Sequence, residues 1–314
     1  MAIISLDWSD MVYDVLALGD YSLDLIFADL ERAPALGKEV YGRKFSMLPG
    51  GTYNTAAALH RLGVNVAWAA NFGNDEFSQF VLKAASEEGL TPVCFSLKDK
   101  PYRNITVAAS YKTERAFISY SDPQIINPVY LRRIFTTPCR ILFISGLYTG
   151  QIFTLGASLI RSRKMLLVMD GNSSAGTLAD QKIVRSLKAV DIFMPNAREA
   201  RRLVGSDKLE DCLKDLGSLI NLVVIKDGRN GAYAIQNGQI THVPGIPVKC
   251  LDTTGAGDCF DAGFLKAYLD NNDLETCLKW GNIVGGLSTQ GFGGSGFIVY
   301  IEDVKKTLKK CYKG

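Results

Sequence analysis

The chain has 314 residues, of which 47% are hydrophobic, and its 35 lysines and arginines against 32 acidic residues leave a net charge of +3. This near-balance argues against nucleic acid as a partner, and no apolar run reaches membrane-spanning length, so a membrane protein is also excluded. The basic cluster between residues 305 and 313 is expected on the exposed face of a last helix.

Seven scattered cysteines form no CxxC pair, so the sequence carries neither of the common zinc and redox motifs. They fit reduced thiols in a cytoplasmic protein. The N-terminal stretch contains Asp7, Asp10 and Asp14 and no basic segment, so a signal peptide is not expected.

Short apolar runs alternate with helical patterns along the chain. In order, the pattern predicts a strand at 12–18, helix 52–62, strand 64–70, helix 76–88, strand 141–144, helix 153–162, strand 166–169, helix 179–187, strand 192–194, helices 199–203 and 209–216, strand 222–225, and helices beginning near 258 and 274. Strands separated by helices predict a mostly parallel sheet with helices on both faces. Such sheets bind ligands at the carboxyl ends of their strands.

Two stretches, 24–46 and 102–120, look like β-structure without intervening helices. Residues 105–107 and 116–120 flank the polar turn 112–115 and predict a hairpin. We expect these pieces, roughly 21–47 and 98–121, to form a small sheet that covers the strand ends as a lid. No flexible linker divides the sequence, so residues 1–314 are expected to form one α/β domain.

The run Asp252-Thr253-Thr254-Gly255-Ala256-Gly257-Asp258 carries the strongest chemical signal. Glycines let a ligand approach the backbone closely, and amides at the start of a helix form an anion site. The amides of Gly255, Ala256 and Gly257 are therefore predicted to bind a transferring anionic group, with Asp258 as general base. Asp258 as a simple partner of the helix dipole, worth about 0.3–1 kcal/mol, is the alternative.

No GxxxxGK[ST] motif is present, which excludes a P-loop. The GxGxxG match at Gly291–Gly296 follows a helical pattern, whereas a dinucleotide site requires a preceding strand. We expect instead a tight loop that closes near residues 252–258, and a dinucleotide oxidoreductase is kept as a minor alternative.

The 252–258 run and several segments in matching order resemble ribokinase-like (PfkB-type) carbohydrate kinases over nearly the whole chain. The matching segments are Gly19–Asp24, Gly50–Asn54 (a double-glycine turn), Asn196–Glu199 (NxxE), Lys226–Gly231 (KxGxxG) and Asn282. The resemblance implies a ribokinase-like three-layer sandwich with a small β-sheet lid. It also implies ATP-dependent phosphorylation of a hydroxyl on a small sugar.

The resemblance assigns further roles residue by residue. Substrate would be bound by Asp24, Gly50, Gly51 and Asn54. The nucleotide would lie beside Asn196, Lys226, Gly228, Gly231 and Asn282. Mg²⁺ would be held, through water, by Asn196 and Glu199. A monovalent cation, expected to be K⁺, would be bound by Asp252, Thr254 and Ser295. Dimerisation through the lid is a further implication.

The family's DxNxR segment reads Asp170-Gly171-Asn172-Ser173-Ser174 here, and the lost arginine favours a neutral sugar over an acidic one. Its GxDxxG segment reads Gly73–Ser78, without the last glycine. A sugar-phosphate acceptor would require basic residues nearby, and the sequence offers Arg103, Lys112 and Arg115 in the predicted lid.

Three alternatives stay open. Tyr53, Phe117 and Tyr120 could stack on the base of a nucleoside, which would make the chain a nucleoside kinase. Asn196 and Glu199 have the spacing of a helix capping box, which needs no magnesium. The third alternative is not an enzyme but a regulator that binds sugar or nucleotide without catalysis. Such a protein would not require Asp258.

Overall fold

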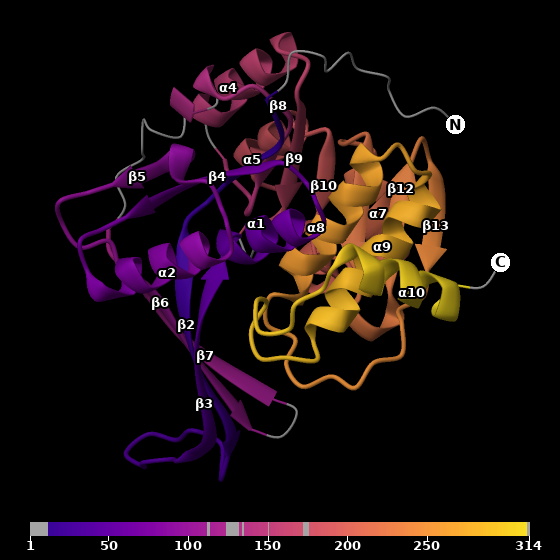
Figure 1. Cartoon of the computed structure of the whole chain (residues 1–314). Coiled ribbons are helices and arrows are strands. Elements are labelled where there is room, and N and C mark those ends of the chain that lie inside the picture. Colours follow the sequence, from indigo (N-terminus) through magenta and orange to yellow (C-terminus); the bar gives the residue numbers. More distant parts are fainter. Residues whose placement is uncertain are drawn as a thin grey trace.

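The computed structural model describes residues 12–111, 114–123, 132–133, 135–149, 151–171 and 176–312. Asn172, Ser173, Ser174, Lys112 and residues 1–11, which the sequence analysis singled out, lie outside the described residues. Figure 1 shows a large twisted sheet between two layers of helices, with a smaller sheet projecting from it.

The large sheet has nine strands in the order β13-β12-β11-β10-β9-β8-β1-β4-β5. Their bounds are β1 Tyr13–Leu18, β4 Val66–Phe72, β5 Phe95–Leu97, β8 Cys139–Ile144, β9 Leu166–Asp170, β10 Ile192–Met194, β11 Leu222–Lys226, β12 Ala232–Gln236 and β13 Gln239–Val243. Pairing is parallel from β5 to β11 and antiparallel between β11, β12 and β13. Every residue of β4, β9 and β11 is buried, as expected for strands covered on both faces.

Side chains alternate between two apolar cores, one on each face of this sheet. In β1, Val15 and Ala17 enter one core, whereas Leu16 and Leu18 enter the other. The helices of the first core are α1 Thr52–Arg61, α2 Glu76–Glu87, α8 Ala256–Leu269, α9 Leu274–Ser288 and α10 Ile301–Cys311. Those of the second are α4 Gln151–Ser162, α5 Gln181–Leu187, α6 Ala197–Val204 and α7 Leu209–Gly217. Short 3₁₀ turns lie at Pro92–Cys94 and Gly228–Asn230. The predicted three-layer α/β architecture is confirmed.

The small sheet has the strand order β3-β2-β6-β7. Its strands are β2 Tyr21–Leu30, β3 Gly42–Gly51, β6 Asn104–Tyr111 and β7 Glu114–Ser121. Strands β6 and β7 form the predicted hairpin, in which Ser110 is paired with Arg115. β2 follows β1 directly, so the small sheet is anchored where strand β1 of the large sheet ends (Figure 1).

Three local features differ from the expectations, the first being the short edge strand β5, which was not predicted. The edge hairpin β12–β13 was missed, although its turn is Asn237-Gly238, with φ of 52° and 75°. Such a pair is a strong signal of a two-residue hairpin. Gly50 and Gly51, expected as a turn, are the last residues of β3. None of the helices in the described part of the chain is long and apolar enough to cross a membrane.

Candidate active site

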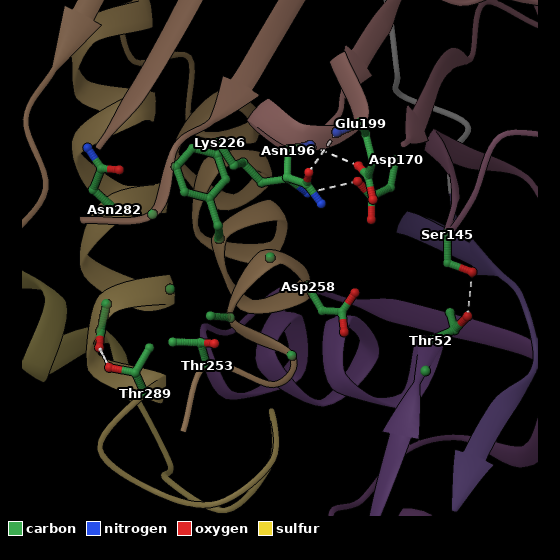
Figure 2. A pocket seen from close by; sticks show the side chains of 18 of the residues that line it. Thr52, Ser145, Asp170, Asn196, Glu199, Lys226, Thr253, Asp258, Asn282 and Thr289 are labelled. Atoms are coloured by element: carbon green, nitrogen blue, oxygen red, sulfur yellow. Dashed lines mark hydrogen bonds and ion pairs between the residues drawn. The ribbon is translucent and has the colours of Figure 1, made fainter. Parts of the chain in front are cut away.

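A cavity of about 1490 Å³ opens where the parallel strands of the large sheet end (Figure 2). Its wall includes residues at or just after the carboxyl ends of successive strands: Gly19 after β1, Ser145 after β8, Asp170 at the end of β9, Asn196 after β10 and Lys226 at the end of β11. The cavity therefore lies at the strand ends, where the sequence analysis expects a ligand site.

The glycine-rich run forms the start of α8 and part of the cavity wall. Gly255 is the N-cap residue with φ 72°, and Gly255, Ala256, Gly257 and Asp258 all line the cavity. The Ala256 N–H donates to the Thr253 carbonyl at 3.2 Å, so it already has a partner within the turn. The amide of Gly257 lies in the first helical turn, where no intrahelical acceptor exists. Of the three predicted donors, Gly255 and Gly257 are the better placed to meet an anion.

The second glycine run packs directly on the first. The Gly293 N–H donates to Asp252 Oδ2 at 2.9 Å, and the Cys259 thiol donates to the Gly294 carbonyl at 3.2 Å. A Cβ on Gly255 would lie 2.3 Å from Gly294 Cα, so this contact requires glycine. The predicted loop closing near residues 252–258 is confirmed. The run follows helix α9 and not a strand, which removes the context of a dinucleotide site.

Asp258 lies at the junction of α8 and α1. Asn54 Nδ2 donates a hydrogen bond of 2.9 Å to Asp258 Oδ2. Burial, reinforced by the charge of Asp170, raises the pKa of Asp258 to about 7, against the opposing effects of the Asn54 hydrogen bond and the charge of Lys226. A carboxylate with a pKa near neutrality is suited to general-base chemistry.

Near the residues predicted to bind substrate, the cavity is lined by hydroxyl groups. Ser22 and Thr52 lie on its wall, and Thr52 Oγ1 donates to Ser145 Oγ at 2.6 Å (Figure 2). Asp24 lies behind this wall, where its carboxylate accepts from Ser22 Oγ at 2.7 Å and burial raises its pKa. Of the four residues predicted to bind substrate, the wall contains Gly51, whereas Asp24, Gly50 and Asn54 stand behind it.

Gly50 explains how Asp24 is accommodated. A Cβ at this position would lie 2.3 Å from Asp24 Oδ2. The glycine is therefore required for close approach of a buried carboxylate, and not for a turn.

Asn196 and Glu199 also line the cavity, and they form a capping box at the start of α6. The Glu199 N–H donates to Asn196 Oδ1, and the Asn196 N–H donates to Glu199 Oε2, both at 2.9 Å. The capping box is thus confirmed, and the magnesium role stays a prediction. Asp170 lies beside them (Figure 2), so three oxygen-bearing side chains of the kind that Mg²⁺ prefers meet here.

The described residues contain no cluster of three or more histidine, cysteine or acidic side chains able to hold a metal by themselves. An oxygen-lined wall of this type suits an ion that keeps several waters and shares its coordination with phosphate groups.

Lys226, predicted beside the nucleotide, is held in a buried ion triad. Its Nζ donates to Asp170 Oδ1 at 2.8 Å and to the two carboxylate oxygens of Asp261 at 2.9 and 3.0 Å. Burial lowers the pKa of Lys226, but the two carboxylates outweigh this effect and the pKa ends above its usual range. Burial also raises the pKa of Asp261 well above its usual value. The triad joins strands β9 and β11 to helix α8, directly beneath the anion loop.

Sequence reasoning gave Asp170 and Asp261 no role. Two signals were present in the sequence. Asp170 ends a strand, and strand ends carry the site in such sheets. Asp261 follows Asp258 by three residues on one helix and therefore shares its face.

At the far end of the cavity, Asn282 supports a loop. Its Nδ2 donates to the carbonyls of Val243 and Pro244 at 3.0 and 3.2 Å. Gly231 has φ 93°, and a Cβ there would lie 2.0 Å from the Val243 carbonyl oxygen. Gly228, Gly231 and Asn282 all line the cavity, as predicted for residues beside a nucleotide.

The residues predicted to bind K⁺ do not converge on one point. Asp252 and Thr254 meet, with Thr254 Oγ1 donating to Asp252 Oδ1 at 2.8 Å. Ser295 is turned elsewhere, and its hydroxyl donates to the Pro49 carbonyl at 3.1 Å. The guanidinium of Arg115 lies against Asp252 and Thr254 instead, at 2.6 and 2.9 Å. As arranged, this donor set does not fit a free monovalent ion.

Residues 13–298 match the family model described as "pfkB family carbohydrate kinase". The chain belongs to this family. Membership makes it an ATP-dependent carbohydrate kinase, as the sequence motifs implied. The chain is 24% identical over 320 residues to a ribokinase of Lactococcus lactis, an alignment that covers 94% of this chain and 97% of that protein.

Solved structures support the same fold. A ribokinase of Arabidopsis thaliana complexed with ribose and ATP superposes with a TM-score of 0.78 at 21% identity, covering 95% of this chain and 99% of that one. A nucleoside kinase of Methanocaldococcus jannaschii superposes with a TM-score of 0.74 at 18% identity, covering 96% and 99%. Likeness at this level of identity shows the fold and leaves the acceptor open.

Proposed function

We propose that this kinase transfers the γ-phosphoryl group of ATP to a hydroxyl of a small neutral sugar, with Asp258 as the general base. The observation that carries the proposal is the placement of Asp258. It lies on the cavity wall beside the amides of Gly255 and Gly257, it is held by Asn54, and its pKa is about 7.

The reaction needs positioning and stabilisation of charge more than covalent chemistry. Asp258 accepts the proton of the attacking hydroxyl as the new O–P bond forms and the bond to the leaving ADP oxygen breaks. The helix N-terminus at Gly255 and Gly257 faces the transferring phosphoryl oxygens, and loss of one such donor typically costs about 10²–10³ in rate. Mg²⁺, held near Asn196 and Glu199 through water, would neutralise phosphate charge when bound.

A neutral acceptor is favoured by the wall of the cavity around Thr52. Its described lining residues there carry hydroxyls (Ser22, Thr52, Ser145) and one carboxylate, Asp20, but no lysine or arginine. A sugar phosphate would bring an anionic group to a wall without a cation, which desolvation makes unfavourable. Of the described basic lid residues predicted to meet such a group, Arg103 pairs with Asp122 and Arg115 with Asp252.

The small sheet is proposed to act as the lid of this site. Ser22 in β2 and Thr106 in β6 line the cavity, so the sheet already forms part of its wall. Closure would exclude water and limit hydrolysis of ATP.

A nucleoside acceptor is the second candidate. The aromatics predicted to stack on a base do not line the cavity: Tyr53 is buried against Trp68, and Phe117 and Tyr120 are exposed on β7. Tyr148, however, lies on the cavity wall and leaves 47% of its surface exposed, so it could supply a stacking surface.

The small sheet also exposes apolar side chains, and we propose that it forms the interface of a homodimer. Phe45, Phe117, Ile118 and Tyr120 are each more than half exposed. Burial of such side chains against a second copy would be favourable. Light scattering coupled to gel filtration tests this proposal, and a monomer at micromolar concentration would refute it.

We also propose a cytoplasmic location, which agrees with the seven free cysteines.

The acceptor is tested by incubating the protein with ATP, Mg²⁺ and a panel of neutral sugars, sugar phosphates and nucleosides. Phosphorylated products are identified by mass spectrometry. The proposal predicts product from a neutral sugar and the highest kcat/KM within that class. Product from nucleosides or sugar phosphates alone would overturn it.

A further inference from the structure

Arg115 joins the small sheet to the segment that leads into the anion loop. It lies on β7, 137 residues from Asp252 in the chain, and its Nη1 contacts Asp252 Oδ1 at 2.6 Å and Thr254 Oγ1 at 2.9 Å. Its Nη2 donates to Thr253 Oγ1. One guanidinium therefore contacts three consecutive residues, which end one position before the N-cap of α8.

The carboxylate of Asp252 needs a positive partner. Its side chain is only 4% exposed, and its oxygens accept from the Thr254 N–H at 3.0 Å and from the Gly293 N–H at 2.9 Å. These amides satisfy hydrogen bonding but do not neutralise the charge, and a buried carboxylate without a cationic partner is strongly destabilising. The ion pair that the described residues give Asp252 is the one with Arg115.

Arg115 differs in position from the residues of the cavity wall. Neither Arg115 nor Asp252 lines the cavity. The side chain of Arg115 extends from the small sheet to the loop and is 27% exposed to solvent. It therefore acts on the reaction through Asp252 and the backbone that follows, and not by contact with substrate.

We propose that Arg115 is a positioning residue whose guanidinium takes the place of a monovalent cation at Asp252 and Thr254. Seating of the small sheet over the site, and not binding of a free ion, then fixes the segment 252–254 and with it the amides of Gly255 and Gly257. The inference rests on the proposed transfer at Asp258. It replaces the K⁺ ion expected from the sequence, because that ion and the guanidinium would compete for the same two oxygens.

The test compares the wild-type protein with Arg115→Gln, which keeps a hydrogen-bonding group but removes the charge. Rates are measured at constant ionic strength with K⁺, Na⁺ or tetramethylammonium as the only monovalent cation. We expect the wild type to respond equally to the three. Arg115→Gln should lose roughly tenfold to a hundredfold in kcat in tetramethylammonium, because the loop amides are misplaced. Added K⁺ or guanidinium should restore much of that loss.

Arg103→Gln is the matched control. Arg103 directly precedes β6 of the small sheet, and it forms an ion pair at 2.9 Å with Asp122, which directly follows β7. Its loss should leave kcat and the cation response unchanged, because it touches neither Asp252 nor the two threonines.

A second measurement does not depend on finding an acceptor. Hydrogen–deuterium exchange of a peptide covering residues 252–260, without substrate, should be faster in Arg115→Gln than in the wild type and should slow again when K⁺ is added. If the wild type phosphorylates no acceptor but the two proteins still differ in exchange in this way, the proposed function fails and the role of Arg115 stands.

Three results would overturn the inference. The first is wild-type kcat, exchange and cation response in Arg115→Gln. The second is a loss of activity that neither K⁺ nor guanidinium restores, since a merely structural arginine would behave in that way. The third is strong K⁺ stimulation of the wild type that is unchanged in Arg115→Gln, since this would place a free ion at Asp252.

Discussion

Asn54 and Asp258 are joined by a hydrogen bond of 2.9 Å from the Asn54 amide to the Asp258 carboxylate, although 204 residues separate them. The bond links helix α1, which follows the small sheet, to helix α8, which begins at the anion loop. It fixes the orientation of the proposed base and stabilises its charged form. Several measurable consequences depend on this pair and on its surroundings.

The rate of phosphoryl transfer should depend on the ionisation of Asp258. Burial raises the pKa of this group to about 7 in the folded protein, so the carboxylate form that accepts a proton is populated above that pH. We predict a kcat/KM profile that rises between pH 6 and 8 with a midpoint near 7. A profile that is flat or falling across this interval would contradict the assignment.

Loss of the Asn54 amide should move that midpoint. The hydrogen bond from Asn54 lowers the pKa of Asp258, so Asn54→Ala should shift the rising limb to higher pH and reduce kcat at neutrality. The neighbouring Thr55 provides a control, because its buried hydroxyl has no hydrogen-bond partner among the described residues. Thr55→Val should retain the wild-type profile. Identical midpoints in Asn54→Ala and the wild type would show that the bond does not tune the base.

The buried triad should dominate the stability of this region. Lys226→Met leaves Asp170 and Asp261 without their cation, and loss of one partner of a buried pair typically costs about 3–5 kcal/mol in the free energy of unfolding. Lys214 forms an exposed pair with Glu210 four residues earlier on α7, so Lys214→Met should leave the free energy of unfolding nearly unchanged. Urea denaturation measures both. Equal losses in the two variants would refute the structural role of Lys226.

Gly255 should tolerate no side chain. A Cβ there would lie 2.3 Å from Gly294 Cα and 2.7 Å from Asn54 Nδ2, so Gly255→Ala must displace the loop or the partner of the base. We expect a loss of about 10²-fold in kcat, since small displacements at a reacting centre have that effect. Gly205 has a similar φ of 78° but nothing within 4 Å. Gly205→Ala should therefore lose about 1–2 kcal/mol of stability and keep its activity. Comparable kcat in Gly255→Ala and Gly205→Ala would contradict the close packing of the anion loop.

The alternation of strands and helices was predictable because each element carries its own periodicity. Val15 and Ala17 enter one core and Leu16 the other, so β1 reads as a continuous apolar run. The β12–β13 hairpin was missed even though Asn237-Gly238 encodes its turn, because short exposed strands such as β13 lack an apolar run.

The site was predictable in part. The glycine-rich run and Asp258 could be found because their chemistry lies within seven consecutive residues. The triad of Lys226, Asp170 and Asp261 brings together three elements, and local patterns carry no information on which distant carboxylates a lysine will meet. Arg115 was noted only as a possible contact of a sugar phosphate, and its contact with Asp252 was missed because 137 residues separate the two.

Asp258→Asn tests whether Asp258 is the base of phosphoryl transfer. This variant keeps the size of the side chain and removes its ability to accept a proton. With the neutral sugar identified as substrate, we predict that kcat falls by about 10²–10⁴-fold while ATP affinity, measured by calorimetry, is unchanged. Asp270→Asn, at the other end of α8, is the matched control and should retain full activity. Undiminished kcat in Asp258→Asn would contradict the account.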